Sequence, residues 1–360
     1  MDAKKLFIKF EKCFFYINFF FAALLVFSYL ASIISPERFW PLAFLGLIYP
    51  ILIYTNLLFV IYWVIRRRKF FFISFVTILI GLNVLLNTIG FSFSDPAKSR
   101  LPAAHLKLMT YNVHNFQSII NNKPADKAML KLIDLNQPDI IGFEEFYSQY
   151  TRFNICDSLK RMLHFNQFYF EPFNITRYDS TGLALFSKYP IINKGVVKLS
   201  SEQDNTPGIF IDITYQSRVV RIYCFHLKSL RLDPPDPADN SLINPSRLKE
   251  IFTKLKAAFI IRAQQVNLIR NDVAKCPYPY IFLGDFNDTP SSYAFNQMSK
   301  GMKNAFKERG SGIGKTFNGS FASFQIDYIL ASQQFDIFNY GVIQKEISDH
   351  FPVYSEVGLK

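Results

Sequence analysis

Short apolar stretches of the chain end in polar or ionisable residues at six places between residues 106 and 353. Asn112 ends the first stretch, the pair Glu144 and Glu145 ends the second, and His226 ends the third, just before a loop. A buried carboxylate needs a cation or a hydrogen-bond donor. For either glutamate considered alone, a salt bridge is the commoner explanation, and for His226 alone it is a structural hydrogen bond.

The other three stretches add carboxylates, an amide and a second imidazole. Strand alternation places Asp285 and Asn287 on one face, where a carboxylate beside an amide suits a general base, or a ligand beside an orienting donor. Asp327 lies inside an apolar strand, and the side chains of Asp349 and His350 diverge, so that one can serve a partner while the other takes a proton. Together the six stretches offer the oxygen ligands that Mg²⁺ or Mn²⁺ prefers. A tetrahedral zinc site is not indicated, since none of the four cysteines has Cys-x-x-Cys spacing.

Strands and helices must position these side chains. Short segments that are β-branched or aromatic and bounded by turn residues predict strands. One helix is predicted from near Pro124 to about Asn136, and another from about Pro245 to Val273, with apolar residues three or four apart. Many strands with few helices predict a two-layer β-sandwich flanked by helices. The predicted strands are residues 106–113, 139–146, 181–187, 208–215, 219–228, 280–287 and 325–331.

Three uncharged stretches precede this region. Residues 13–36, 39–65 and 70–94 contain no Asp, Glu, Lys or Arg. A helix of about 20 apolar residues crosses a bilayer, so we predict three transmembrane helices in a membrane region of residues 1–95, followed by a linker at residues 96–104. Buried helices of a soluble protein, or a cleaved signal peptide for the first stretch, are the alternatives. Three long stretches in succession argue against both.

Positive charges flank the predicted spans unevenly. Four lysines lie within residues 4–12, and residues 66–69 are three arginines and a lysine, whereas the first link has one arginine and one glutamate. Basic residues near span ends favour the cytoplasm, so we expect a cytoplasmic N-terminus and an extracytoplasmic domain after residue 95. The net charge is +5 for residues 1–95 and +7 for residues 96–360. This suits a polyanionic or phosphate-bearing partner and an anionic membrane surface equally well.

The motifs also occur in a characteristic order. They are Tyr-Asn-Val (111–113), Phe-Glu-Glu (143–145), Phe-His-Leu (225–227), Gly-Asp-Phe-Asn-Asp (284–288), Ile-Asp-Tyr-Ile (326–329) and Ser-Asp-His (348–350). This set resembles the endonuclease/exonuclease/phosphatase superfamily, which includes pancreatic deoxyribonuclease, neutral sphingomyelinases and inositol-polyphosphate 5-phosphatases. The resemblance covers residues 105–358. It implies a four-layered α/β sandwich with two packed, mainly antiparallel sheets.

The resemblance implies a divalent-metal site. Glu145 falls at the position of the family's main metal-binding glutamate, and Asn112 at the residue that helps to hold the metal and the phosphate. Asp349 would be a further carboxylate of the metal site. The expected cofactor is therefore Mg²⁺ or Mn²⁺.

The resemblance also implies catalytic roles. Asp285 would activate or orient the attacking water, with Asn287 beside it. His350 would contact the phosphoryl oxygens or move a proton, and Asp327 would orient it. His226 would stabilise the pentavalent phosphorus or the leaving group.

Two cations are candidates for phosphate binding. Lys188 stands where the family often has an arginine, and it keeps the charge without the bidentate fork. Arg262 interrupts the apolar face of the second predicted helix, so it needs a carboxylate or a bound anion, unless it extends from the edge of that face. His114 occupies a position where apurinic-site endonucleases have an acidic residue, which argues against that particular activity.

We therefore predict a membrane-anchored, divalent-metal-dependent phosphodiesterase or phosphohydrolase that is nuclease-like and cleaves a phosphoester by in-line attack of water. A lipid headgroup hydrolase, either sphingomyelinase-like or phosphoinositide phosphatase-like, is the first alternative. A non-catalytic, membrane-tethered binding module is the second. The expected partners are the lipid bilayer and a phosphoester substrate, which is a nucleic acid or a lipid headgroup; no protein partner is predicted.

Overall fold

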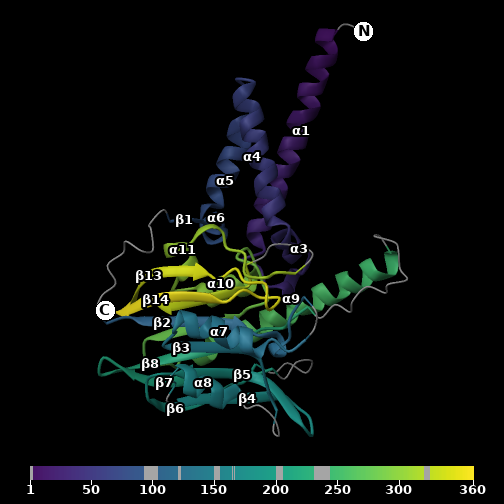
Figure 1. Cartoon of the computed structure of the whole chain (residues 1–360). Helices are drawn as coiled ribbons and strands as arrows, with labels where there is room; N and C mark the ends of the chain where they lie inside the picture. Colours follow the sequence, from purple (N-terminus) through teal and green to yellow (C-terminus); the bar gives the residue numbers. More distant parts are fainter. Residues whose placement is uncertain are drawn as a thin grey trace.

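The fold has two parts, a bundle of helices and an α/β domain (Figure 1). The computed structural model describes residues 3–92, 104–120, 123–149, 155–163, 165, 167–199, 206–230, 244–319 and 325–360. The predicted linker at residues 96–104 lies outside the described residues except for its last position, Ala104.

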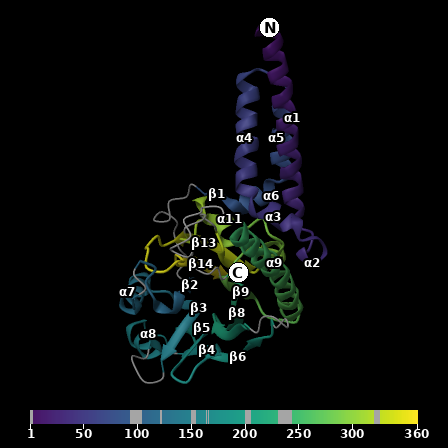
Figure 2. The ribbon, with the colours of Figure 1, turned by 90° about the vertical axis from the view of Figure 1, so that its right-hand side faces the viewer.

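Helices α1, α4 and α5 of the bundle, whose bounds are given below, run side by side away from the α/β domain (Figures 1 and 2). Buried polar side chains join them: Asn18 Nδ2 donates to Ser74 Oγ, which in turn donates to Asn56 Oδ1. The Trp63 indole N–H donates to Asn18 Oδ1. The helices of the bundle are α1 (Ala3–Leu30), α2 (Pro36–Phe39), α3 (Pro41–Leu47), α4 (Tyr49–Ile65), α5 (Phe71–Ile80) and α6 (Leu82–Thr88).

Two of the three predicted spans are broken helices. Among the described residues, Lys9–Leu30 is one helix that is long and apolar enough to cross a membrane. Two further candidates count only if each bent pair is one span: α3 with α4, which meet at 62°, and α5 with α6, which meet at 72°. Pro50, in the first turn of α4, cannot donate to the preceding turn, and Gly81 packs so closely on Tyr29 that a Cβ atom would lie 2.0 Å from its ring.

Two six-stranded sheets form the centre of the α/β domain. The strand orders are β13-β14-β2-β3-β5-β4 and β10-β12-β9-β8-β7-β6. Pairing is antiparallel except between β2 and β3 and between β8 and β9. The first sheet contains β2 (Leu106–Asn112), β3 (Ile140–Gln149), β4 (Gln167–Ile175), β5 (Asp179–Ser187), β13 (Phe335–Val342) and β14 (Val353–Leu359). The second contains β6 (Ile191–Val197), β7 (Gly208–Tyr215), β8 (Arg218–His226), β9 (Tyr280–Asp285), β10 (Met302–Asn304) and β12 (Asp327–Ser332).

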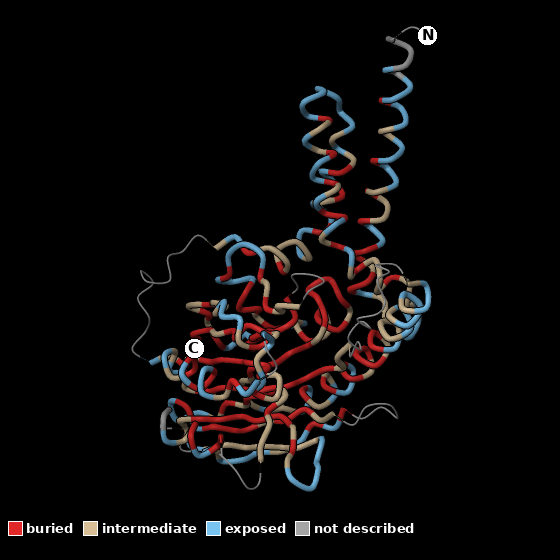
Figure 3. Tube along the Cα trace, turned by 45° about the vertical axis from the view of Figure 1, so that its right-hand side comes forward, coloured by how far each residue is buried: buried red, intermediate tan, exposed pale blue. Residues whose placement is uncertain are grey.

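The sheets pack face to face, and helices cover both outer faces. Apolar side chains such as Leu108, Leu185, Ile222 and Leu283 fill the space between the sheets. Helices α7 (Asp126–Asn136) and α8 (Ile155–Leu163) pack on the outside of the first sheet, and α9 (Pro245–Val273) and α10 (Tyr293–Ser299) on the outside of the second. Buried residues follow the strands, whereas the bundle is largely exposed (Figure 3). The expected four-layered α/β sandwich with mainly antiparallel sheets is confirmed.

The bundle and the α/β domain are in direct contact. Strand β1 (Ile89–Phe91), which follows α6, pairs with β11 (Ser311–Ile313) as a two-stranded sheet. The buried Ser291 hydroxyl donates to the Gly46 carbonyl of α3, and Asn296 Nδ2 donates to the Ser32 carbonyl. Two short elements, η1 (His114–Phe116) and α11 (Ala305–Arg309), complete the described secondary structure.

Candidate active site

The candidate site lies where the carboxyl ends of the two parallel strand pairs meet. In the first sheet Asn112 of β2 is aligned with Glu144 of β3. In the second sheet Asp285 of β9 is aligned with both His226 of β8 and Asp327 of β12. Parallel strands end at the same edge of a sheet, and here the edges of two packed sheets coincide. Residues up to 215 positions apart therefore converge on one point.

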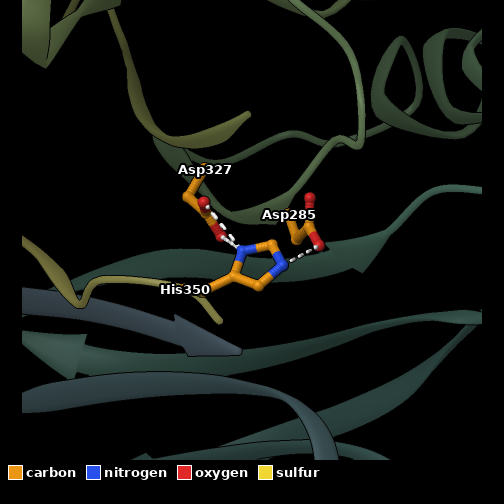
Figure 4. Close-up of side chains that lie close together, drawn as sticks. All are labelled: Asp285, Asp327 and His350. Carbon is orange, nitrogen blue, oxygen red and sulfur yellow. Dashed lines mark hydrogen bonds and ion pairs between the residues drawn. The ribbon is translucent and has the colours of Figure 1, made fainter. Parts of the chain in front are cut away.

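His350 lies between two buried aspartates (Figure 4). Its Nδ1 is 3.0 Å from both carboxylate oxygens of Asp327, and its Nε2 is 3.6 Å from Asp285 Oδ2. Burial acts to lower the pKa of His350, but the charges of Asp327 and Asp285 outweigh it and raise that pKa well above its usual value. The two carboxylates therefore favour the protonated imidazole, which is oriented by Asp327 and points at Asp285.

Asp285 is the centre of the cluster. Burial raises its pKa to about 6, and the Asp327 charge acts in the same direction, while His350 and His226 oppose the shift. Asn112 Nδ2 lies 3.2 Å from Asp285 Oδ2 and 3.5 Å from Glu145 Oε1, so that one amide bridges two carboxylates from different sheets. At neutral pH a carboxyl group with this pKa is mostly ionised and able to accept a proton.

His226 also points at both carboxylates. Its Nε2 is 3.7 Å from Asp285 Oδ2 and 3.9 Å from Glu145 Oε1, and this buried nitrogen makes no hydrogen bond to the described residues. A buried polar atom without a partner is costly, so such an atom is a candidate for contact with a ligand.

Two of the candidate residues have strained backbones. Glu145 and Asn287 both have a φ of 52°, in the left-handed region that non-glycine residues seldom adopt. Glu145 lies in an irregularity of β3 between Phe143 and Phe146, where the pairing with β5 shifts register. This bulge turns Glu145 towards the site and its neighbour Glu144 into the core. Strain of this kind persists where the surroundings hold the residue in place.

Several hydrogen bonds hold the Asn287 turn. Its backbone N–H donates to Asp285 Oδ1 over 2.8 Å, and its side-chain Nδ2 donates to the Leu227 carbonyl over 3.0 Å. The buried Arg262 of α9 donates to the Asn287 carbonyl and forms an ion pair of 3.1 Å with Asp288. Of the partners expected for Arg262, the structure supplies a carboxylate, and it does not bring the guanidinium to the Asp285 cluster.

Lys188 lies far from the other candidates. It follows β5, whose last residue, Ser187, pairs with Ile140 at the start of β3, whereas Glu145 lies towards the other end of β3. Its Nζ is 3.4 Å from Asp139 Oδ1. The expected phosphate contact would need Lys188 at the opposite edge of the sheet, and the antiparallel course of β5 prevents this.

Asp349 occupies the rim of the site. It forms an ion pair of 3.0 Å with His114, and both side chains are partly exposed. Burial acts to raise the pKa of Asp349, but His114 and His350 lower it below its usual value. Conversely, the Asp349 carboxylate raises the pKa of His114. The sequence indicated His114 only as a departure from one subgroup, and its pairing with Asp349 depends on the η1 turn.

Glu144 is a buried carboxyl group that the sequence analysis did not assign to a role. Its Oε1 accepts from Thr110 Oγ1 over 2.8 Å and from the Cys224 thiol over 3.2 Å, between the two sheets. Burial raises its pKa well above the usual value, which favours the neutral form of Glu144. Strand alternation was the available signal, since it puts adjacent residues on opposite faces.

The donor set suits a hard divalent cation. Ligand atoms of Asp285 and Asp327 lie within 4.8 Å of each other and of a ring nitrogen of His350, and all three residues are buried. A protonated His350 has no free ring nitrogen for a metal, so the carboxylate and amide oxygens would hold the ion. Glu145 and Asn112 adjoin Asp285 from the other sheet. Four carboxylates share the site with three histidines, so a cation would offset excess negative charge. Oxygen predominates among the ligands, as Mg²⁺ and Mn²⁺ require.

Comparison with known proteins agrees with this geometry. The sequence profile of the endonuclease/exonuclease/phosphatase family matches residues 109–350, about two thirds of the chain. The chain therefore belongs to this family, which places it among the hydrolases of phosphoric esters. Residues 11–88 match a second profile, described as a domain of unknown function (DUF8431). No match was found among the curated proteins.

Solved structures share the fold of the α/β domain. An endonuclease/exonuclease/phosphatase from Beutenbergia cavernae is 16% identical, with a TM-score of 0.54 over 71% of this chain and 72% of that one. A protein of the same description from Bacteroides vulgatus is 15% identical, with a TM-score of 0.52 over 71% and 100%. The human Nocturnin catalytic domain with a bound sulfate anion is 16% identical, with a TM-score of 0.51 over 72% and 95%.

Proposed function

We propose that this protein is a membrane-anchored, divalent-metal-dependent phosphodiesterase or phosphohydrolase. The observation that carries the proposal is the convergence of Asp285 and Asp327 from the second sheet with Asn112 and Glu145 from the first sheet and His350 from the loop before β14. The placement of Glu145 and Asn112 beside Asp285 supports a cation site between the sheets. The cation would be Mg²⁺ or Mn²⁺, and when bound it supplies positive charge opposite the phosphoryl oxygens.

Each side chain has a task that follows from its position. Asp285 accepts a proton from water, because it is ionised at neutral pH and lies at the centre of the cluster. His350 presents a positive charge beside it and is fixed by Asp327. The unpartnered Nε2 of His226 is available to a phosphoryl or leaving-group oxygen. Asn287 shapes the turn that follows Asp285.

The arrangement of the bundle supports three spans with the α/β domain outside the cytoplasm. Glu11 of α1 pairs with Arg66 and Arg68, so both basic clusters lie at the bundle end remote from the α/β domain. Exposed apolar side chains such as Leu58 and Ile80 surround the helices, as expected of a surface that faces lipid. Basic residues at one end of the bundle favour a cytoplasmic N-terminus.

A nucleic acid is the first substrate class to test, because the α/β half is basic and the phosphodiester is the shared chemistry. A lipid headgroup is the second candidate, and the bundle contact favours it. Ser291, four residues beyond Asn287, donates a hydrogen bond to Gly46 of α3, near the start of the second predicted span. The catalytic turn is therefore close to the end of the bundle.

The test is hydrolysis by the full chain in lipid nanodiscs. Plasmid DNA, RNA, a phospholipid and an inositol polyphosphate are assayed with Mg²⁺, with Mn²⁺ and with chelator. We expect metal-dependent cleavage of one phosphoester class that Asp285→Asn and His350→Ala both abolish. Asp157→Asn is the matched control, because Asp157 is an exposed aspartate on α8.

Two results would contradict the proposal. Hydrolysis that persists in Asp285→Asn would show that the reaction takes place at another site in the chain. Failure of the wild-type chain both to cleave any substrate and to bind Mg²⁺ would leave the second alternative, a membrane-tethered binding module.

A further inference from the structure

Helix α9 extends well beyond the sheet that it covers. Its second half packs on the sheet through residues such as Val266 and Ile269. In its first half, residues 245–257, none is buried. This half projects from the α/β domain beside α2 and α3 (Figures 1 and 2). An apolar helix face is normally buried, so apolar residues in a half that does not pack on the core indicate another contact surface.

The projecting half is nevertheless amphipathic. Leu248, Ile251, Phe252 and Leu255 are three or four residues apart, and therefore lie on one face of the helix. Leu248 is 51% exposed and Phe252 is 43% exposed. The apolar face thus continues past the α/β domain into open surroundings.

This apolar face is continuous with the start of the second predicted span, residues 39–65. The Phe252 ring stacks on Phe44 of α3 with 4.6 Å between centroids, and meets Trp40 edge-on at 5.4 Å. The Phe44 ring also packs edge-on against Phe259 further along α9. The start of a span lies near the membrane boundary, so the face of α9 reaches the same level.

Basic residues flank the apolar face on both sides. On a helical wheel Lys249 and Lys256 lie on one side of Phe252, and Arg247 and Lys254 on the other. With Glu250 as the one acidic residue among residues 245–257, the net charge of this half is +3. Long basic side chains beside an apolar stripe allow the stripe to enter the headgroup region while the charges reach lipid phosphates.

We propose that residues 245–257 of α9 form an interfacial helix that lies on the anionic surface of the bilayer crossed by the bundle. The inference rests on the proposed three-span topology. Its occupant is the lipid surface, because the apolar face continues from the start of the second predicted span and the flanking charges are positive.

The consequence for the active site follows from the same helix. Arg262, further along α9, donates to the Asn287 carbonyl and pairs with Asp288. One continuous helix therefore joins the lipid surface to the turn after Asp285. The site is held at the membrane surface, where a membrane-bound phosphoester can reach it.

The test uses tryptophan fluorescence of the full chain in nanodiscs whose acyl chains carry bromine, a contact quencher. Leu248→Trp places a probe on the apolar face, and Thr253→Trp places one on the opposite, exposed face as the matched control. The fluorescence of Trp40 and Trp63 is subtracted with the unmodified chain in the same discs. We expect quenching of the Leu248→Trp probe to exceed that of the control at least about twofold, and to increase when phosphatidylglycerol is included.

Equal, weak quenching of both probes in inserted protein would overturn the inference and leave the proposed hydrolase intact. Failure of the chain to co-float with lipid would overturn the anchoring and, with it, the inference. A Leu248→Trp probe that responds to an added oligonucleotide and not to brominated lipid would assign the face to nucleic acid instead. Hydrolysis measured on the same samples separates these outcomes from failure of the catalytic proposal.

Discussion

The bundle and the candidate site both bury polar groups, but they do so in different ways. In the bundle, Asn18, Asn56 and Ser74 are uncharged and satisfy one another. At the end of the sandwich, Asp285 and Asp327 are buried with charges opposed by histidines. The hydrogen bonds of the bundle join its helices at little cost in free energy. The buried carboxylates of the site repel one another, and a bound cation or substrate can reduce this repulsion. Buried polar groups alone are therefore no sign of function. Buried charges combined with polar atoms that lack a hydrogen-bond partner are such a sign.

The largest expected effect comes from removing charge at the site. Asp285→Asn keeps the shape of the side chain but removes the proton acceptor, and we expect kcat to fall by at least about a thousandfold. The Tm of the metal-free variant should equal or exceed that of the wild type, because one of two neighbouring buried negative charges is gone. Steady-state kinetics measure the expected fall in kcat, and calorimetry measures the expected Tm. A marked loss of Tm would show that Asp285 is structural.

Metal binding should stabilise the fold in a pH-dependent way. Burial raises the pKa of Asp285 to about 6 from 3.8, so between these values the folded metal-free chain holds a proton that the unfolded chain has released. This contribution to stability is lost as the pH rises from about 4 to about 6. Mg²⁺ needs the ionised carboxylate, so the increase in Tm on adding Mg²⁺ should be larger at pH 7 than at pH 5. A Tm increase independent of pH would place the ion away from Asp285.

Arg262 is buried and charged, like the residues of the site, but its role is structural, like that of the polar residues in the bundle. Arg262→Leu leaves Asp288 buried without its partner, and we expect a loss of about 3–5 kcal/mol in the free energy of unfolding. The double variant Arg262→Leu with Asp288→Leu should recover part of that loss in denaturant titrations. The kcat of the double variant should stay low, since the Asn287 carbonyl has lost its donor. Full recovery of kcat would show that Arg262 contributes to stability and not to catalysis.

A smaller effect is expected in the bundle. Asn56→Leu removes bonds to the Phe21 carbonyl and to Ser74, and should reduce stability by about 0.6–2 kcal/mol without changing kcat. Thr55→Val on the same helix is the control, because Thr55 bonds only within its own helix among the described contacts. Thermal unfolding in nanodiscs measures both. A loss of activity in Asn56→Leu would mean that the bundle does more than anchor.

The smallest effect is expected at Lys188. It pairs with Asp139 at the edge of the sheet opposite the candidate site. We expect Lys188→Gln to leave kcat and KM within about twofold of the wild type, as for a surface ion pair. A rise in KM of tenfold or more for a phosphoester substrate would instead support the phosphate contact that the sequence predicts for Lys188.

Much of the fold could be predicted from the sequence because local patterns carry it. The predicted strands correspond to β2, β3, β5, β7, β8, β9 and β12, and the predicted helix from Pro245 to Val273 is α9. The sequence pattern did not predict β4, β6, β13 and β14, nor the three-residue strands β1, β10 and β11, because strand formation depends on pairing with neighbouring strands as well as on the local pattern. The breaks at Ile48 and Gly81 were missed because hydropathy does not detect a bend.

By itself, the sequence determined which side chains are available for chemistry, their order along the chain and the family to which they belong, because residue type and spacing are local properties. The tertiary structure alone decided which of them meet. It brought Asn112 to Asp285, turned Glu145 outwards and Glu144 inwards at a bulge, and paired Arg262 with Asp288. Strand register and sheet packing set these distances, and they depend on contacts between segments that are far apart in the chain.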